Sequence, residues 1–133
     1  MKQKASDLKL VKNIEWRGFI ADPKVIYEDI DVCVVPSRSD DPLPTAALEA
    51  GAFGRPVVGT SRGELPEIVQ NGVTGFVIEA RRPDQLAQAI KSFVRNPDLV
   101  KTMGEAARRR IQSEFSLERC VQQFIGVVED FRA

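Results

Sequence analysis

The sequence predicts an α/β fold, in which a parallel sheet of about four strands is covered by helices on both faces. Short, continuously apolar runs such as residues 32–35 suit the strands of a parallel sheet that is buried on both sides. Between these runs lie helical patterns that begin at recognisable start signals. Strands and helices that alternate in this way are typical of a single doubly wound sheet.

Four segments are predicted to be strands. Residues 13–19 (NIEWRGF) alternate apolar and polar side chains before a turn at Gly18, which is the pattern of a half-buried strand. Residues 32–35, 56–60 and 74–79 are mostly apolar and are bounded by proline, glycine and polar residues. Together these segments supply the strands of one sheet.

Each long helix is predicted to begin at a proline or a polar capping residue. The start signals are Asp22-Pro23, Pro44, Arg82-Pro83-Asp84, Asn96-Pro97-Asp98 and Ser116, and a shorter helix is expected over residues 64–69. The last three long helices carry apolar stripes, which we expect to belong to the core. The stripes are Leu86, Ile90, Phe93 and Val94; Leu99, Val100, Met103, Ala107 and Ile111; and Leu117, Cys120, Val121, Phe124, Val128 and Phe131. The basic run Arg108, Arg109 and Arg110 is interpreted as a solvated face.

Composition excludes several classes of function. The 133 residues suffice for one domain with its own core, so residues 1–133 are treated as a single domain. Nineteen basic and nineteen acidic residues cancel, so no nucleic acid is expected as a partner. There is no histidine, which excludes a Ser-His-Asp triad and histidine-bearing metal sites. Two isolated cysteines, and no apolar run long enough to span a bilayer, indicate a cytoplasmic protein.

The stretch from residue 32 to residue 63 carries the candidate site. A polar loop at residues 36–42 follows an apolar strand, and ligands of open α/β sheets bind at that end of the strands. Pro44 is expected to be the first helical residue, which leaves the amides of Thr45, Ala46 and Ala47 free. Free amides at the positive end of a helix form an anion site.

Glu49 is the least expected residue of this helix, because its neighbours are small or apolar and unpaired carboxylates are rarely buried. One interpretation is a solvated helix face, or a carboxylate that is bonded to nearby backbone. The other is a carboxylate held out for a polyhydroxyl ligand, such as the vicinal hydroxyls of a ribose. The pattern of residues leaves both open.

The segment DPLPTAALEAGAFGRPVVGTSRGELPEIVQNGVTGFVIE resembles the carboxyl-terminal domain of family 4 (group 1) retaining glycosyltransferases of the GT-B fold. That family carries two acidic residues separated by seven, a small-residue helix, G-x-P-V-V, a Gly-Gly-x-x-Glu turn and a strand that starts with Asn/Asp-Gly. The corresponding features here are Asp41 and Glu49, residues 54–58, residues 63–67 and residues 71–77. The resemblance covers about residues 13–131 and implies a Rossmann-like, partial GT-B carboxyl-terminal domain that binds a nucleotide-sugar donor.

Three positions depart from the family pattern. The first acidic residue is Asp41 where the family usually has Glu, although Asp-Pro-Leu-Pro-Thr looks like a variant used by part of the family. Pro44 stands where glycine is common and removes one backbone donor near the expected sugar. Glu64 replaces the second glycine of the turn and adds a charge close to the expected phosphate site.

The resemblance implies roles for individual residues. Asp41 would be catalytic and contact hydroxyls of the donor sugar, while Glu49 would bind the ribose hydroxyls. The other expected donor- or nucleotide-binding residues are Ser37, Leu43, Pro44, Thr45, Ala46, Gly63 and Glu67, with the diphosphate at the helix start. For Glu67, a helix-capping carboxylate in the first turn is an equal alternative. The donor is expected to be a UDP-, GDP- or ADP-sugar, with no metal and no other cofactor.

The resemblance also implies that parts of the family's enzyme are absent from this chain. These are the amino-terminal, acceptor-binding glycosyltransferase domain and the segment whose Arg and Lys bind the leaving diphosphate. Partial substitution by Arg38 or Arg62 is an alternative. The parent protein is therefore expected to be an enzyme that transfers a sugar with retention, and this truncated domain to be inactive alone. The full enzyme is expected to be cytoplasmic, with peripheral attachment to the inner membrane face as an alternative.

The family's domain has six strands in the order 3-2-1-4-5-6, which places two absent strands between residues 13–19 and residues 32–35. A strand edge left open there would carry unpaired backbone groups. We expect either direct pairing of these two segments or a homodimer in which a second chain fills the gap. The alternative function is an inactive remnant that acts as a homo-association module through this edge.

Overall fold

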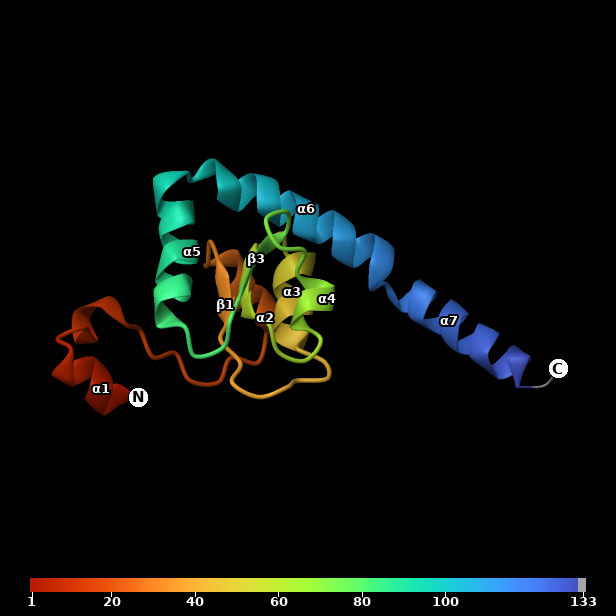
Figure 1. The fold of residues 1–133 in the computed structure, drawn as a ribbon, viewed down its shortest axis with the longest axis horizontal. Coiled ribbons are helices and arrows are strands. Elements are labelled where there is room, and N and C mark those ends of the chain that lie inside the picture. The colour runs from red at the N-terminus through yellow and green to blue at the C-terminus, as the bar shows by residue number, and fades with distance from the viewer. Residues whose placement is uncertain (132–133) are drawn as a thin grey trace.

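A computed structural model describes residues 1–131 of the chain. Within these residues the sheet is parallel and has three strands, β1 (Cys33–Val35), β2 (Val57–Thr60) and β3 (Gly75–Ile78), in the order β1-β2-β3 (Figure 1). Cys33 is paired with Val57, and Val57 is paired with Gly75. The prediction of a parallel sheet built from the apolar runs is confirmed.

Helices cover the sheet and extend beyond it. They are α1 (Lys2–Asp7), α2 (Pro23–Glu28), α3 (Thr45–Ala52), α4 (Leu65–Ile68), α5 (Pro83–Arg95), α6 (Asp98–Glu114) and α7 (Leu117–Asp130), with a short 3-10 helix, η1, over Val11–Asn13. Two predicted caps are confirmed, because the side chains of Asp22 and Ser116 accept hydrogen bonds from amides in the first turns of α2 and α7. Pro44 lies one position earlier than predicted and is the N-cap of α3.

The core lies on both faces of β2, all four residues of which are buried. On one face, Val57 packs in a cluster with Tyr27 of α2 and Leu65 of α4. On the other face, Val58 packs in a cluster with Phe93 of α5. Successive side chains of a strand point to opposite faces, so one apolar run contributes to both clusters.

The prediction of a strand over residues 13–19 is wrong, and so is its direct pairing with β1. The chain from residue 14 to residue 20 has no regular structure, and the side chains of Trp16 and Phe19 are exposed. An alternating pattern forms a strand only where a neighbour completes its hydrogen bonds, and within residues 1–131 this segment pairs with no strand. The outer edge of β1 is unpaired within the same residues.

α7 extends away from the sheet as a continuation of α6, on the side opposite the N-terminus (Figure 1). None of its residues is buried, and Phe124 is 70% exposed. The prediction that its stripe belongs to the core is therefore wrong, since nothing within residues 1–131 covers that stripe. The stripes of α5 and α6 contribute to the core through Phe93, Met103 and Ala107, but the prediction is wrong for Ile90 and Val94 of α5, which are exposed.

Candidate functional site

The candidate site lies at the carboxyl edge of the sheet, where the loops after β1 and β2 are joined. The Thr60 hydroxyl donates to the backbone oxygen of Ser37 (2.8 Å). Farther along, the Gly63 amide donates to Asp40 Oδ1 (3.2 Å), beside Asp41. Three residues singled out in the sequence, Ser37, Asp41 and Gly63, thus belong to one connected pair of loops.

Gly63 allows these loops to approach each other at backbone distance. Its φ is +53°, and a Cβ at this position would overlap the backbone of Asp41. The next amide, that of Glu64, donates to the Asp41 backbone oxygen (3.1 Å). Any larger residue at position 63 would push the Asp41 loop away from the turn that supports it.

The Asp41 side chain is half-buried and is fixed by its own loop. Its Oδ1 accepts a hydrogen bond from the Leu43 amide (3.0 Å), which is the geometry of an Asx turn. The Oδ2 atom has no hydrogen-bond partner within residues 1–131. The Leu43 side chain is exposed, so this residue contributes its backbone to the arrangement.

The start of α3 offers two unused amides. Pro44 is buried, and its carbonyl accepts a hydrogen bond from the Ala47 amide (2.9 Å), so the prediction that this third amide is free is wrong. In the described part of the chain, the amides of Thr45 and Ala46 donate to no acceptor. Because the dipole of α3 is positive at this end, these amides form a site for an anion.

The Glu49 carboxylate is held by a side chain that sequence analysis missed. The Tyr27 hydroxyl lies 3.0 Å from Glu49 Oε2 and 3.3 Å from the Ala46 carbonyl oxygen, so the half-buried carboxylate lies beside the first turn of α3. The bond is to a side chain and not to backbone. The signal that could have found Tyr27 is that a buried tyrosine needs a polar partner.

Burial and the charge of Glu49 act on two neighbouring groups. Burial, followed by the hydrogen bond and charge of Glu49, raises the pKa of Tyr27, so the hydroxyl keeps its proton and remains a donor. Burial, with a smaller effect of Glu49, raises the pKa of the Cys33 thiol to about 11. Both groups are therefore neutral at physiological pH beside the carboxylate.

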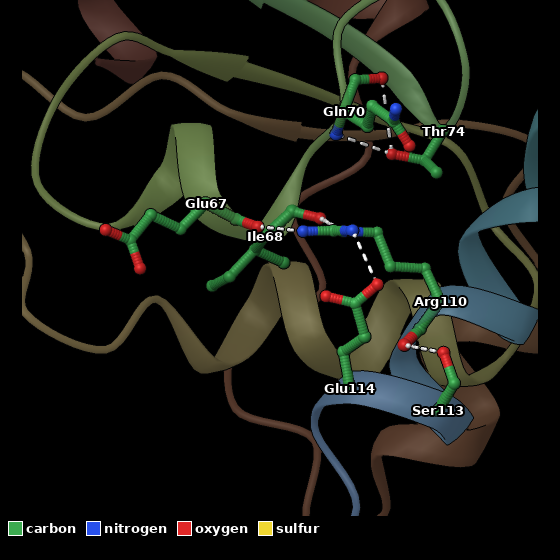
Figure 2. A network of polar contacts seen from close by, with 7 residues as sticks. All are labelled: Glu67, Ile68, Gln70, Thr74, Arg110, Ser113 and Glu114. Carbon is green, nitrogen blue, oxygen red and sulfur yellow. Dashed lines mark hydrogen bonds and ion pairs between the residues drawn. The ribbon is translucent and has the colours of Figure 1, made fainter.

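Glu67 lies on α4, and its side chain is exposed. Its backbone oxygen accepts a hydrogen bond from Arg110 (2.7 Å), while its carboxylate points away from that arginine (Figure 2). Within residues 1–131, no side chain makes a capping hydrogen bond at the start of α4. Glu67 therefore lies on the helix that follows the Gly63 turn, with its carboxylate directed to solvent.

Two cavities lie near the sheet, and neither is lined by Asp41, Glu49 or Thr45. A cavity of 380 Å³ lies at the carboxyl edge and is lined in part by Arg38. A cavity of 720 Å³ lies beside the residues that precede β1 and β2, including Arg55.

The described residues contain neither a metal-binding cluster nor a helix that could cross a membrane. Within residues 1–131, no group of three or more Cys, Asp or Glu side chains is placed to hold a metal ion. No helix in the same residues combines the length and the apolar character that crossing a membrane requires.

Comparison with known families and proteins gives consistent matches. The family described as "Glycosyl transferases group 1" matches residues 1–110. D-inositol 3-phosphate glycosyltransferase of Streptomyces griseus is 42% identical over 87 residues, which are 65% of this chain and 18% of that protein. Spore coat protein SA of Bacillus subtilis is 30% identical over 108 residues, which are 80% of this chain and 29% of that protein. This chain spans less than a third of either relative.

Solved structures share the fold over nearly the whole chain. Sucrose-phosphate synthase of Thermosynechococcus elongatus has a TM-score of 0.89 and 28% identity, covering 98% of this chain and 33% of that one. HepE of Anabaena in complex with UDP has a TM-score of 0.92 and 24% identity, and the match covers 97% of this chain and 35% of that one. The C-terminal domain of LpcC, a glycosyl transferase group 1 protein of Francisella tularensis, has a TM-score of 0.77 and 26% identity, covering 87% and 60%. The predicted Rossmann-like α/β fold of a GT-B carboxyl-terminal domain is confirmed.

Proposed function

This chain belongs to the group 1 glycosyltransferases, and from that premise we propose that it is the donor-binding portion of an enzyme that transfers a sugar from a nucleotide-sugar to an acceptor with retention. The observation that carries the proposal is the arrangement around α3. At the start of α3 the amides of Thr45 and Ala46 have no acceptor within residues 1–131, with Asp41 in the loop before the helix and Glu49 one turn into it.

The helix start suits the diphosphate of the donor. Two unpaired amides and the positive end of the α3 dipole attract an anion, and the small side chain of Ala46 leaves room for it. Glu49 follows Thr45 by four positions, which corresponds to about 6 Å along the helix axis. That spacing fits a ribose that is attached to a diphosphate at the helix start.

Tyr27 orients the Glu49 carboxylate for binding the ribose. Its hydroxyl holds Oε2, and within residues 1–131 the Oε1 atom has no hydrogen-bond partner. A carboxylate accepts several hydrogen bonds, so Glu49 can bind vicinal ribose hydroxyls while Tyr27 fixes its orientation. Asp41 would contact the sugar hydroxyls, and Ser37, Leu43, Pro44, Gly63 and Glu67 would shape the surrounding edge, without a metal.

Structural relatives support a nucleotide as the ligand. HepE was solved with UDP, with UDP-glucose, and with UDP and glucose, on the fold that this chain shares. We extend this to a donor that is a UDP-, GDP- or ADP-sugar. A cytoplasmic location of the enzyme is part of the same proposal, because nucleotide-sugars are expected there.

The chain alone is proposed to bind the donor without transferring the sugar. It spans less than a third of the relatives, and we place acceptor binding and neutralisation of the leaving diphosphate in the remaining parts of the enzyme. Loss of a single electrostatic contact to a developing charge costs on the order of 10² to 10³ in rate. Arg38 lines the cavity at the carboxyl edge, and partial replacement of such contacts by this residue is the alternative.

A calorimetric titration of this chain with UDP, GDP and ADP and their glucose or mannose conjugates tests the proposal. We expect saturable binding of one nucleotide series, weakened about tenfold by Glu49→Gln, which retains the shape but loses the charge. Glu129→Gln on α7 is the matched control and should bind like the original chain. Absence of binding for all nucleotides at several millimolar would contradict the proposal.

A second function, homo-association through the sheet edge, is favoured by one observation. The outer edge of β1 is unpaired within residues 1–131, and such edges recruit other strands. Sedimentation equilibrium over a wide concentration range distinguishes the two functions. A dimer without nucleotide binding supports association as the function, whereas a monomer that binds nucleotide rules it out.

A further inference from the structure

The basic run on α6 is not the uniform solvated face that the sequence predicted. Arg108 and Arg109 are exposed, but the Arg110 side chain is only 24% exposed and reaches across to α4. Its Nη2 donates to the Glu67 carbonyl (2.7 Å), and its Nε donates to the Ile68 carbonyl (3.2 Å) (Figure 2). One guanidinium thus binds the last two carbonyls of α4.

The guanidinium is itself held in place. Its Nη1 donates to Glu114 Oε1 (3.0 Å), one turn farther along α6, and the Phe115 ring lies 5.7 Å from its Cζ. The planar fork of an arginine donates along fixed directions, so these contacts set where the α4 carbonyls must lie. A lysine could not span both carbonyls in this way.

α4 needs such support because it has only four residues. A single helical turn is unstable by itself, and its last carbonyls have no partner within the helix. Leu65 and Ile68 anchor one side of α4 in the core, and the buried Thr74 fixes the chain that follows by accepting from the Gln70 amide (2.8 Å). Arg110 supplies the remaining contact, at the carboxyl end of the helix.

The opposite end of α4 carries the turn that supports the candidate site. The amides of Gly63 and Glu64 donate to Asp40 and to the Asp41 backbone, respectively. Any displacement of α4 therefore moves the loop that holds the Asp41 carboxylate. α6 is joined to this loop through α4 and the Gly63 turn.

We infer that Arg110 is a positioning residue for donor binding: by clamping the end of α4 it holds the Gly63–Glu64 turn and the Asp41 loop in the geometry that receives the donor sugar. The inference rests on the proposed function of this edge. Arg110 does not itself reach the ligand. Its loss should therefore affect the sugar end of the donor more than the nucleoside end, which Glu49 and the start of α3 bind.

The test compares two affinities in the same chain, that for a nucleoside diphosphate and that for its sugar conjugate. In Arg110→Ala we expect the diphosphate affinity to change less than about twofold and the conjugate to bind about tenfold more weakly. Arg110→Lys should weaken conjugate binding by an intermediate factor, because lysine keeps the positive charge but cannot donate to both α4 carbonyls at once. Arg109→Ala, an exposed neighbour on the same helix, is the control and should leave both affinities unchanged.

Hydrogen–deuterium exchange of the unliganded variants completes the test. Arg110→Ala should speed exchange selectively over residues 63–69, and Arg109→Ala should not. If the original chain binds nucleotide and Arg110→Ala keeps the ratio of the two affinities, the inference is overturned while the proposed function stands. If the original chain binds no nucleotide, the proposed function fails, and the positioning role fails with it even where exchange changes.

Discussion

α6 and α7 are consecutive helices with similar apolar stripes, but only one stripe is covered. On α6, Met103 and Ala107 are buried. On α7, the corresponding face has no buried residue, and Leu117 is 75% exposed. The spacing of apolar residues therefore identifies the face of a helix that requires cover, whereas contacts with distant elements decide whether it is covered.

The glycines of α6 and α7 also differ in how closely other parts of the chain pack against them. A Cβ on Gly104 of α6 would overlap the backbone oxygen of Gly54, so α6 lies against the chain at backbone distance there. A Cβ on Gly51 of α3 would crowd the side chain of Ile111 of α6, so α3 and α6 also pack closely there. A Cβ on Gly126 of α7 would meet no atom of residues 1–131 within 4 Å. Close packing ends where α6 ends.

The largest expected effect comes from truncating one side chain in each stripe. Met103→Ala should lower the free energy of unfolding by about 2–5 kcal/mol, because it leaves a cavity in a packed cluster. Leu117→Ala should change it by less than about 0.5 kcal/mol. Urea denaturation followed by circular dichroism measures both. Equal losses would show that α7 is covered in solution.

The two cysteines provide a second contrast, in reactivity. Because burial raises the pKa of Cys33 from 9.0 to about 11, its thiolate fraction at pH 8 is about a hundredfold below that of an ordinary thiol. Cys120 on α7 is exposed and should be alkylated by iodoacetamide at the rate of a peptide cysteine. Mass spectrometry at timed intervals separates the sites. Equal rates would contradict the packing of α3 against β1.

The same shift predicts a pH dependence of stability. Cys33 keeps its proton to higher pH in the folded chain than in the unfolded chain, so the unfolded chain releases its proton first as the pH rises. The contribution of this thiol to the free energy of unfolding should be complete below about pH 9 and lost between about pH 9 and pH 11. Cys33→Ser compared with the original chain across that range isolates the effect, and equal slopes would contradict it.

Glycine substitution should give effects of opposite sign in the two helices. Gly104→Ala should destabilise the fold by about 1–3 kcal/mol, because α6 must move away from Gly54. Gly126→Ala should raise the helix content of α7, by up to about 1 kcal/mol in helix stability. Thermal denaturation and far-ultraviolet circular dichroism report the two quantities. A destabilising Gly126→Ala would reveal a partner packed against α7.

A small, local effect is expected at the cap of α7. Ser116→Ala removes the acceptor of the Arg119 amide and should cost about 1 kcal/mol or less of helix stability. Because α7 buries no residue, the loss should appear as fraying of α7 in amide exchange and not as a lower midpoint of global unfolding. A lower global midpoint would show that α7 is coupled to the core.

The sequence predicted the features that local residues determine. The apolar runs became β1, β2 and β3, and Asp22 and Ser116 cap helices as expected. Residues 13–19 were predicted incorrectly because strand formation depends on a neighbour that no local pattern reveals. The meeting of the loops after β1 and β2 at the candidate site could be predicted from sheet topology, because parallel strands place their carboxyl ends together.

The contacts that complete the candidate site could not be predicted in this way. Tyr27 and Glu49 are 22 residues apart, and Arg110 binds carbonyls that lie more than 40 residues earlier in the chain. A buried tyrosine requires a polar partner, but the sequence does not say which. The sequence of a basic run does not show which of its arginines packs against another helix and which ones stay exposed to solvent.

In the proposed function, the start of α3 receives the phosphates of a nucleotide. A two-dimensional amide NMR titration with UDP, GDP or ADP tests it most directly. We expect the Thr45 and Ala46 amides to show the largest saturable shifts, with smaller shifts at the Gly63 turn. Shifts that gather instead around Arg55 and the 720 Å³ cavity, or no saturable shift for any of the three nucleotides, would contradict it.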